Sequence, residues 1–296
     1  LDILSGDLAA VRNSVYAGDA TPAQLKAESM NFVFRILASF NVATLLCLPI
    51  LFYNLCFRTK PWWWNFSLFF ASLSAPIAGI QGVDRTEMIY YALMLLFCIL
   101  FFWPHMSSRL RRRMFFALLP FFLMGVVYVT AVSQARFEKQ DSSATERNIQ
   151  YGGQGYINFC YFWNNANYDE LTVERIFPLY TKYTSNKNSG MSRREERSGQ
   201  QGFFISVFAS FIGDILLDVS PIGMIVWVTC FSFIGLLLIR TSHRTQYDIS
   251  EVLLLFTMAC IPVFGIFYYR FYTFLHSYSV LLALLFYFLS RYRFRL

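Results

Sequence analysis

The chain has 296 residues, of which 56% are hydrophobic, 19% aromatic and 15% charged. An ordinary soluble domain carries about 25% charged residues, so this composition, with 33 Phe residues, excludes that class and predicts an integral membrane protein. The net charge of +7 does not indicate nucleic-acid binding, because the basic residues lie beside apolar runs, where membrane topology accounts for them.

The stretch before the first apolar run, Leu1–Met30, is polar to mixed. It predicts a short amphipathic helix, a turn and a second helix start near Thr21. Leu1 stands in mid-pattern, without the charged and apolar regions of a signal peptide. We therefore expect a trimmed N-terminus and further membrane spans before Leu1.

Seven apolar runs approach the roughly 20 residues that a helix needs to cross a bilayer. Several of them end in the basic and aromatic residues that favour membrane interfaces, such as the Trp62–Trp64 cluster and the arginine-rich run Arg109–Arg113. The predicted spans cover residues 32–57, 66–80, 88–103, 114–132, 222–239, 252–268 and 274–289.

A long polar loop, residues 134–201, separates the fourth span from the fifth. Loops of this length without secondary structure are usually functional or disordered. The middle of the loop, Ile149–Tyr183, is rich in aromatic residues, and we expect it to be ordered. Its ends, Glu138–Arg147 and Asn186–Gln201, are expected to be mobile.

The apolar stretch Phe203–Ile239 decides the topology. If Arg109–Arg113 face the cytoplasm, as the excess of basic residues on that side requires, the long loop lies outside. A crossing by residues 203–218 would then put the later basic clusters, at 240–244 and 291–295, outside. If residues 203–218 do not cross, every basic cluster falls inside.

Residues 203–218 are also short for a span, and their polar side chains recur every fourth residue, as one stripe on a helix. These side chains are Ser206, Ser210, Asp214 and Asp218. We predict a re-entrant or interfacial helix at 203–218, which turns at Ser220-Pro221 into the span 222–239. The predicted fold is all-α: one polytopic transmembrane helical bundle, residues 1–296, with a large outer loop.

Six arginines fall on the predicted outer side, where topology does not require basic residues. Arginine forks match phosphate oxygens in pairs, so these side chains are candidates for binding a lipid-linked diphosphate. The alternative is that these arginines are ordinary solvated loop residues or form local ion pairs. This alternative is weakest for Arg270, because its neighbours in the sequence are apolar and aromatic. The six are Arg12, Arg85, Arg136, Arg147, Arg175 and Arg270.

Two carboxylates and one histidine are candidates for acid–base chemistry on a sugar hydroxyl. Asp214 lies in the middle of the polar stripe, and Asp218 follows one turn later, where the alternative is a helix cap. His276 lies just inside the last span; a structural hydrogen bond is its alternative role. No D-x-D pair is present, so a metal-dependent sugar transferase is not indicated. We expect neither a metal nor a cofactor.

The aromatic segment of the long loop, Tyr156–Asp169, has side chains suited to sugars. Trp163 and its aromatic neighbours could stack on sugar rings, while Asn158, Asn164 and Asn165 could bond hydroxyls. The alternative is a helix that lies in the lipid headgroup layer.

The run F-x-G-D-x-x-x-D-x-x-P-x-G before an apolar span resembles the region after the large periplasmic loop of bacterial O-antigen and oligosaccharide repeat unit polymerases of the Wzy type. The residues that carry the resemblance are Gly213, Asp214, Asp218 and Gly223. Ser220-Pro221 departs from that pattern, in which Gly is more usual. The I-N-F run at Ile157 and the early outer segment with Asp7 and Arg12 are also similar to these polymerases.

The resemblance implies a metal-independent, GT-C-like membrane glycosyltransferase in the bacterial inner membrane. Its partners would be a polyprenyl-diphosphate-linked oligosaccharide donor and acceptor, membrane lipids and a chain-length regulator, and no nucleic acid. Outer arginines would hold the diphosphate, and a carboxylate or histidine would assist the acceptor hydroxyl. An O-antigen ligase is the nearest alternative. A transporter of lipid-linked glycans is a further one, although the spans lack the repeats and distributed polar residues typical of transporters.

Overall fold

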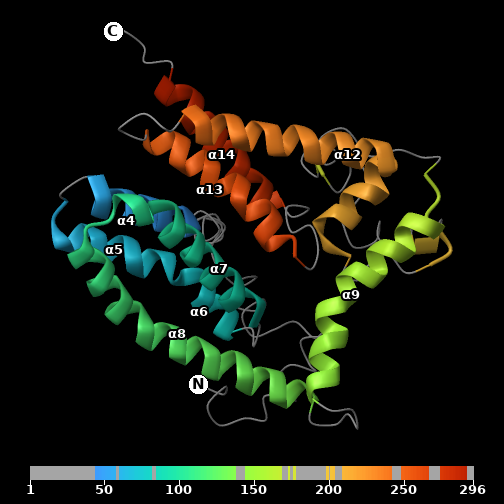
Figure 1. Cartoon of the computed structure of the whole chain (residues 1–296), viewed down its shortest axis with the longest axis horizontal. Coiled ribbons are helices and arrows are strands. Elements are labelled where there is room, and N and C mark those ends of the chain that lie inside the picture. Colours follow the sequence, from blue (N-terminus) through green and yellow to red (C-terminus); the bar gives the residue numbers. More distant parts are fainter. Residues whose placement is uncertain are drawn as a thin grey trace, which may run out of the picture. The chain divides into compact units, whose positions relative to one another are not determined.

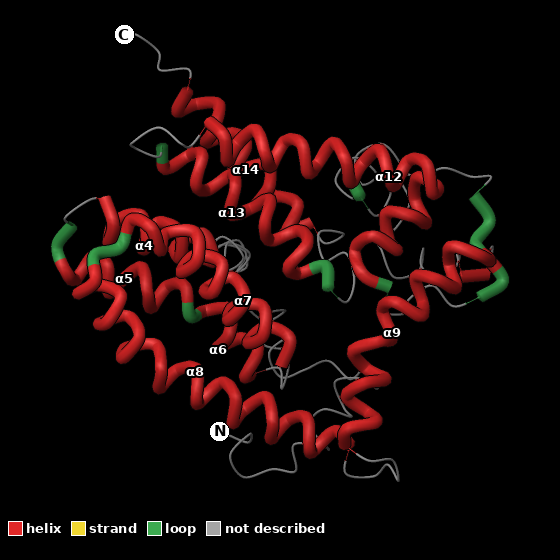
Figure 2. Tube along the Cα trace, viewed as in Figure 1, coloured by secondary structure: helices red, strands yellow, loops and turns green. Residues whose placement is uncertain are grey.

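The computed structural model describes residues 44–57, 60–81, 85–137, 144–168, 173, 176–177, 198–199, 201–203, 209–241, 248–266 and 274–291. The chain divides into two compact units, residues 1–141 and 142–296. Helices account for most of the described residues, and none of these residues lies in a strand (Figure 2). The predicted all-helical fold class is therefore confirmed for the described part of the chain.

In the first unit, α7 (Arg85–Phe102) is the central helix and contacts α4 (Cys47–Phe57), α6 (Ser74–Gln81) and α8 (Ser108–Phe137) (Figure 1). The rings of Phe52 in α4 and Phe102 in α7 stack with their centroids 5.9 Å apart. Both side chains are buried, together with Leu48 and Met94. Aromatic packing between α4 and the end of α7 therefore forms the core of this unit.

The run predicted as one span at 66–80 forms two short helices, α5 (Trp62–Ser72) and α6. Pro76 explains the break, because it has no N–H to donate and its ring crowds the carbonyl four residues earlier, at Ser72. The Ser72 hydroxyl donates to the Phe69 carbonyl, and it also bonds to the Tyr91 hydroxyl of α7, 2.9 Å away. Neither short helix is long enough to cross a bilayer by itself.

In the second unit, α12 (Ser210–Thr241) contacts both α9 (Ala144–Asn165) and α13 (Ile249–Phe264), and α13 contacts α14 (Phe274–Arg291). Asp248 caps α13 by accepting a hydrogen bond from the Ser250 amide. α9 arises from the long loop. It begins at Ala144, so residues 144–147, expected to belong to a mobile end of that loop, are helical.

Three of the described helices are long and apolar enough to cross a membrane. These candidate spans are Thr86–His105, Ser108–Ala131 and Ser210–Ile239, and they include the predicted spans 88–103 and 222–239 and all but the last residue of 114–132. α8 extends beyond the predicted span at both ends, because Arg and Ala continue the helix into the flanking polar sequence. The apolar helices Thr44–Phe57, Ile249–Phe264 and Ser279–Ser290 are shorter.

Candidate functional site

The candidate site is organised around a break in α12. Ser220 has φ 68° and ψ 171°, and the helix changes direction there (Figure 1). That conformation is nearly restricted to glycine, and Pro221 favours the extended ψ because its ring excludes the helical conformation from the residue before it. The break lies at the Ser220-Pro221 turn that the sequence predicts.

The break divides α12 into two parts of different length. The first part, Ser210–Val219, is about 15 Å long, which is half of a bilayer core. The second, from Pro221 to Ile239, is about 28 Å long and is nearly sufficient to cross by itself. Ser210, at the start of the first part, also has a positive φ, of 63°. We name residues 210–219 the short helix.

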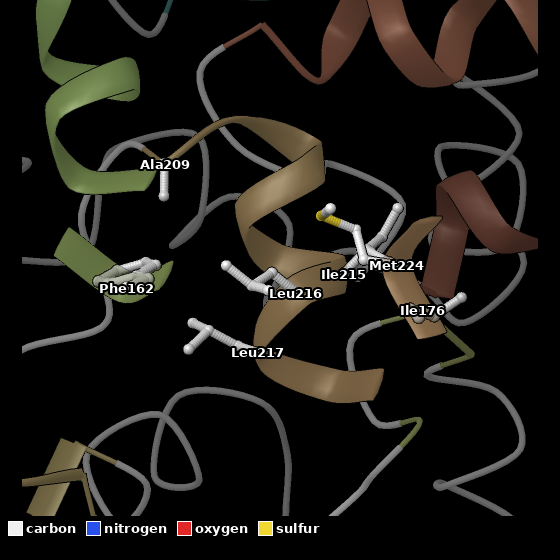
Figure 3. Packing of buried hydrophobic residues seen from close by; sticks show 7 residues of the cluster. All are labelled: Phe162, Ile176, Ala209, Ile215, Leu216, Leu217 and Met224. Atoms are coloured by element: carbon white, nitrogen blue, oxygen red, sulfur yellow. The ribbon is translucent and has the colours of Figure 1, made fainter. Parts of the chain in front are cut away.

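The short helix is enclosed by the second unit, whereas the second part of α12 exposes a row of large apolar side chains. All residues from Gly213 to Asp218 are buried, and a cluster of buried side chains packs around them (Figure 3). Leu216 points towards Phe162 of α9, while Ile215 lies on the side of Met224 (Figure 3). The two aspartates therefore lie in an apolar interior.

Asp218 is fully buried, and its Oδ2 accepts a hydrogen bond from the Ile176 amide at 3.0 Å. A buried carboxylate is costly unless it is bonded, and a bond from a backbone N–H to a charged acceptor is among the stronger ones. The bond ties the segment after α9 to the short helix. Asp218, predicted as a substrate-binding residue with helix capping as the alternative, thus holds neighbouring backbone in the interior.

Asp214 lies one helical turn before Asp218 and on the same side of the helix. Its exposed fraction is 6%, whereas that of Asp218 is 0%. Of the two predicted acids, Asp214 is therefore the one that keeps some accessible surface.

Gly265 lets the end of α13 approach the start of the short helix closely. A Cβ atom at Gly265, at the end of α13, would overlap the Phe211 side chain, and the Phe211 amide donates to the Gly265 carbonyl at 2.7 Å. Gly155 of α9 is in ordinary contact with the Ser210 amide and the Ile266 carbonyl, and Gly213 packs tightly against Ala209 and in ordinary contact with Phe159 and Phe162. The start of the short helix thus lies where α9 and α13 meet.

α9 buries Phe162 against the short helix and exposes other aromatic side chains. Tyr156 is 73% exposed and Trp163 is 40% exposed, and Ile157 and Tyr161 are exposed beside them. The amides of Asn164 and Asn165 donate to carbonyls one turn earlier in the same helix, and Asn158 is half-buried. The predicted sugar-binding residues therefore belong to one helix, with Trp163 at its surface.

Tyr168 closes the end of α9. Its hydroxyl donates to the Phe162 carbonyl at 2.8 Å. Burial raises the pKa of the Tyr168 hydroxyl, so that it stays protonated as a donor above the usual pH range of tyrosine. Gln201 exchanges two hydrogen bonds with the backbone of Asn167, which fastens the far end of the long loop to α9.

The remaining predicted residues lie at helix ends or outside the described residues. The backbone of Arg85 begins α7, that of Arg136 lies in the last turn of α8, and that of Arg147 lies in the first turn of α9. His276 lies in the first turn of α14. Arg12, Arg175 and Arg270 lie outside the described residues. The described residues hold no group of three or more His, Cys, Asp or Glu side chains that could bind a metal ion.

Comparison of the chain with protein-family models, with curated proteins and with solved structures finds no match.

Proposed function

We propose that the protein is a metal-independent glycosyltransferase that polymerises lipid-linked oligosaccharide repeat units at the outer face of a bacterial inner membrane. The observation that carries this proposal is the position of Asp214. It lies in a short helix between two backbone distortions, Ser210 and Ser220, directly before a helix long enough to cross a bilayer. Such distortions cluster at functional sites.

The motif that resembles the polymerases coincides with this feature. Gly213 packs tightly against Ala209, Asp214 and Asp218 lie on one side of the short helix, and Gly223 lies near the start of the second part of α12, against Val219. The proposed arrangement in the membrane is a seven-span bundle in which the short helix does not cross. The length of the short helix, about half of a bilayer core, favours this arrangement, and the burial of its two aspartates meets the requirement that charged groups at membrane depth be covered by protein or water.

In the proposed reaction, a sugar hydroxyl of the acceptor attacks the anomeric carbon of the donor glycan. The bond from that carbon to the diphosphate oxygen breaks, and its electron pair leaves with the polyprenyl diphosphate. The Asp214 carboxylate receives the hydroxyl proton as general base. Asp218 acts as a positioning residue through Ile176, and the aromatic surface of α9 stacks on the glycan.

The outer arginines supply the other half of the proposed chemistry. A diphosphate leaving group gains negative charge as the bond breaks, and fixed guanidinium donors stabilise that charge. Arg270 is the leading candidate, followed by Arg136, Arg175, Arg85 and Arg12. Arg270→Lys keeps the charge and loses the fork, so we expect it to shorten the polymer, as Arg270→Ala does.

The test is polymer length in cells that depend on this protein, measured on a gel for Asp214→Asn. We expect single-repeat products at normal protein abundance. The matched control is Asp248→Asn, because this residue caps α13 away from the site and an amide oxygen can still accept its hydrogen bond. Full-length polymer made by Asp214→Asn would overturn the assignment. Full-length polymer that stays on its lipid carrier in the absence of the protein would favour the ligase instead.

A further inference from the structure

The first unit carries a second feature that the proposed reaction does not use. It lies at the C-terminal end of α7, away from Glu87 in the first turn of that helix. Phe57, at the end of α4, lies against His105 of the 3₁₀ turn η2 (Trp103–His105), with ring centroids 5.1 Å apart. α5 begins just after α4, and α8 begins just after η2. Figure 1 shows the end of α4 and the starts of α5 and α8 at the same end of this unit.

This end combines exposed aromatic and basic side chains. Trp62 is 76% exposed, and Trp63, Trp64, Trp103, Phe115 and Phe116 are exposed as well. Lys60, Arg109, Arg112 and Arg113 are exposed in the same connections and in the first turns of α8. Tryptophan beside basic residues is the composition of a membrane interface.

Arg111 has a different role from its neighbours. Its guanidinium donates to the Trp103 carbonyl at 2.8 Å and lies 4.7 Å from the centroid of the Trp103 ring. These two contacts fix the turn between η2 and α8, and Ser107 caps that turn by accepting from the Leu110 amide. Arg109, Arg112 and Arg113 lie in the same helix start but do not take part in these contacts with Trp103.

Among the described residues of the first unit, Glu87 is the one carboxylate, so none lies beside this charge in that part of the chain. There is no Asp or Glu from residue 29 to residue 83, and none from residue 88 to residue 137. Glu87 lies at the opposite end of α7, about 25 Å of helix away. In the described part of this unit the basic side chains thus have no carboxylate beside them and can attract anions, and α8 continues from them as an exposed apolar helix of membrane length.

We propose that this end of the first unit binds the anionic headgroups of membrane phospholipids. Arg109, Arg112 and Arg113 contact the lipid phosphates, while the tryptophans lie among the headgroups. The apolar surface of α8 begins directly after the arginines in the helix. A lipid could therefore place its phosphate against the arginines and its acyl chains against the adjacent apolar surface. The occupant is thus an anionic lipid and not a free phosphate.

The test uses the full chain purified in a neutral detergent, mixed with equal amounts of phosphatidylglycerol and phosphatidylcholine, and measured by native mass spectrometry. Each basic residue near an anionic surface changes binding about fivefold. We expect a preference for phosphatidylglycerol that falls at least tenfold in Arg109→Gln/Arg112→Gln/Arg113→Gln. Replacing the same three residues by Lys should retain most of the preference, because the charge remains.

The matched control removes three arginines elsewhere, as Arg193→Gln/Arg194→Gln/Arg197→Gln, and should keep the full preference. Added inorganic phosphate or a short RNA should not displace the lipid. An unchanged preference in the first Gln variant, an equal loss in the control, or displacement by phosphate or RNA would overturn the proposal. If the first Gln variant does not fold, the test is the preference of the unaltered protein at rising salt concentration. Salt should lower this preference, because it screens the attraction between exposed charges and the lipid. A preference that does not change with salt would overturn the proposal.

Discussion

The carboxylate of Asp218 accepts a hydrogen bond from the amide of Ile176, a residue 42 positions earlier in the chain. One end of the bond is in the helix before the break of α12, and the other is in the segment after α9. Because both groups are buried, the bond fixes the path of that segment against the short helix.

Replacing Asp218 should therefore destabilise the second unit. Asp218→Ala leaves the buried Ile176 amide without its acceptor, and we expect a loss of about 2 kcal/mol in the free energy of unfolding. Asp218→Asn keeps an oxygen acceptor and removes a buried charge, so the loss should be smaller. Denaturant unfolding in detergent measures both, and hydrogen exchange at Ile176 should accelerate most in the Ala variant. Equal stability of Asp218→Ala and the unaltered protein would contradict this role.

Ser220 carries the backbone distortion that separates the short helix from the second part of α12. Ser220→Gly should leave stability unchanged or raise it by up to about 1 kcal/mol, since glycine adopts this conformation without strain. Ser220→Val should lower it by about 1–3 kcal/mol, because a β-branched side chain is strongly disfavoured there. Thermal unfolding distinguishes the two variants. A continuous helix through residue 220 would reverse their order.

Gly265 and Gly235 make a matched pair for the close packing at the start of the short helix. A Cβ at Gly265 would lie 2.7 Å from the Ile261 carbonyl and would overlap Phe211, whereas a Cβ at Gly235 of α12 meets nothing within 4 Å. Gly265→Ala should therefore cost about 1–3 kcal/mol. Gly235→Ala should stabilise by up to about 1 kcal/mol, as expected in a helix interior. Similar effects at both positions would show that Phe211 packs against Gly265 less closely than described.

The proposed topology predicts opposite sides for the long loop and the connection after α12. Single cysteines at Ser189 and Ser242, each in a chain without other cysteines, should react differently with a reagent that does not cross membranes. We expect labelling of intact spheroplasts at Ser189 alone, and labelling at Ser242 only after lysis. Labelling of both positions in intact spheroplasts would contradict the proposed topology, in which only the second part of α12 crosses the membrane between these two positions.

Hydropathy and turn chemistry predict much of this fold, because they act locally. The runs in α7 and α8 are apolar enough to identify these helices without further information. The Ser220-Pro221 pair marks the break in α12 because proline excludes a helical residue before it. By contrast, Pro76 divides a predicted span at Ser72, and helix-forming residues extend α8 to Phe137, so that boundaries are less well predicted than the elements.

The site is harder to predict because its contacts are distant in sequence. Asp218 is a visible candidate, but its partner is a backbone amide, a group that every residue except proline carries. The four-residue spacing predicts one polar stripe, whereas the structure buries all residues from Gly213 to Asp218. Gly265 gains its importance only from Phe211, which packs against it. Exposure separates Asp214 from Asp218, and exposure depends on the assembled helices.

The most direct test of the proposed function is synthesis by the purified protein in lipid vesicles that contain a polyprenyl-diphosphate-linked repeat unit as the only glycan. We expect glycans of two and more repeat units, release of one polyprenyl diphosphate for each bond formed, full activity in the presence of EDTA, and no products with Asp214→Asn. Recovery of the repeat unit with unchanged length under these conditions, by a protein that remains folded, would contradict the account.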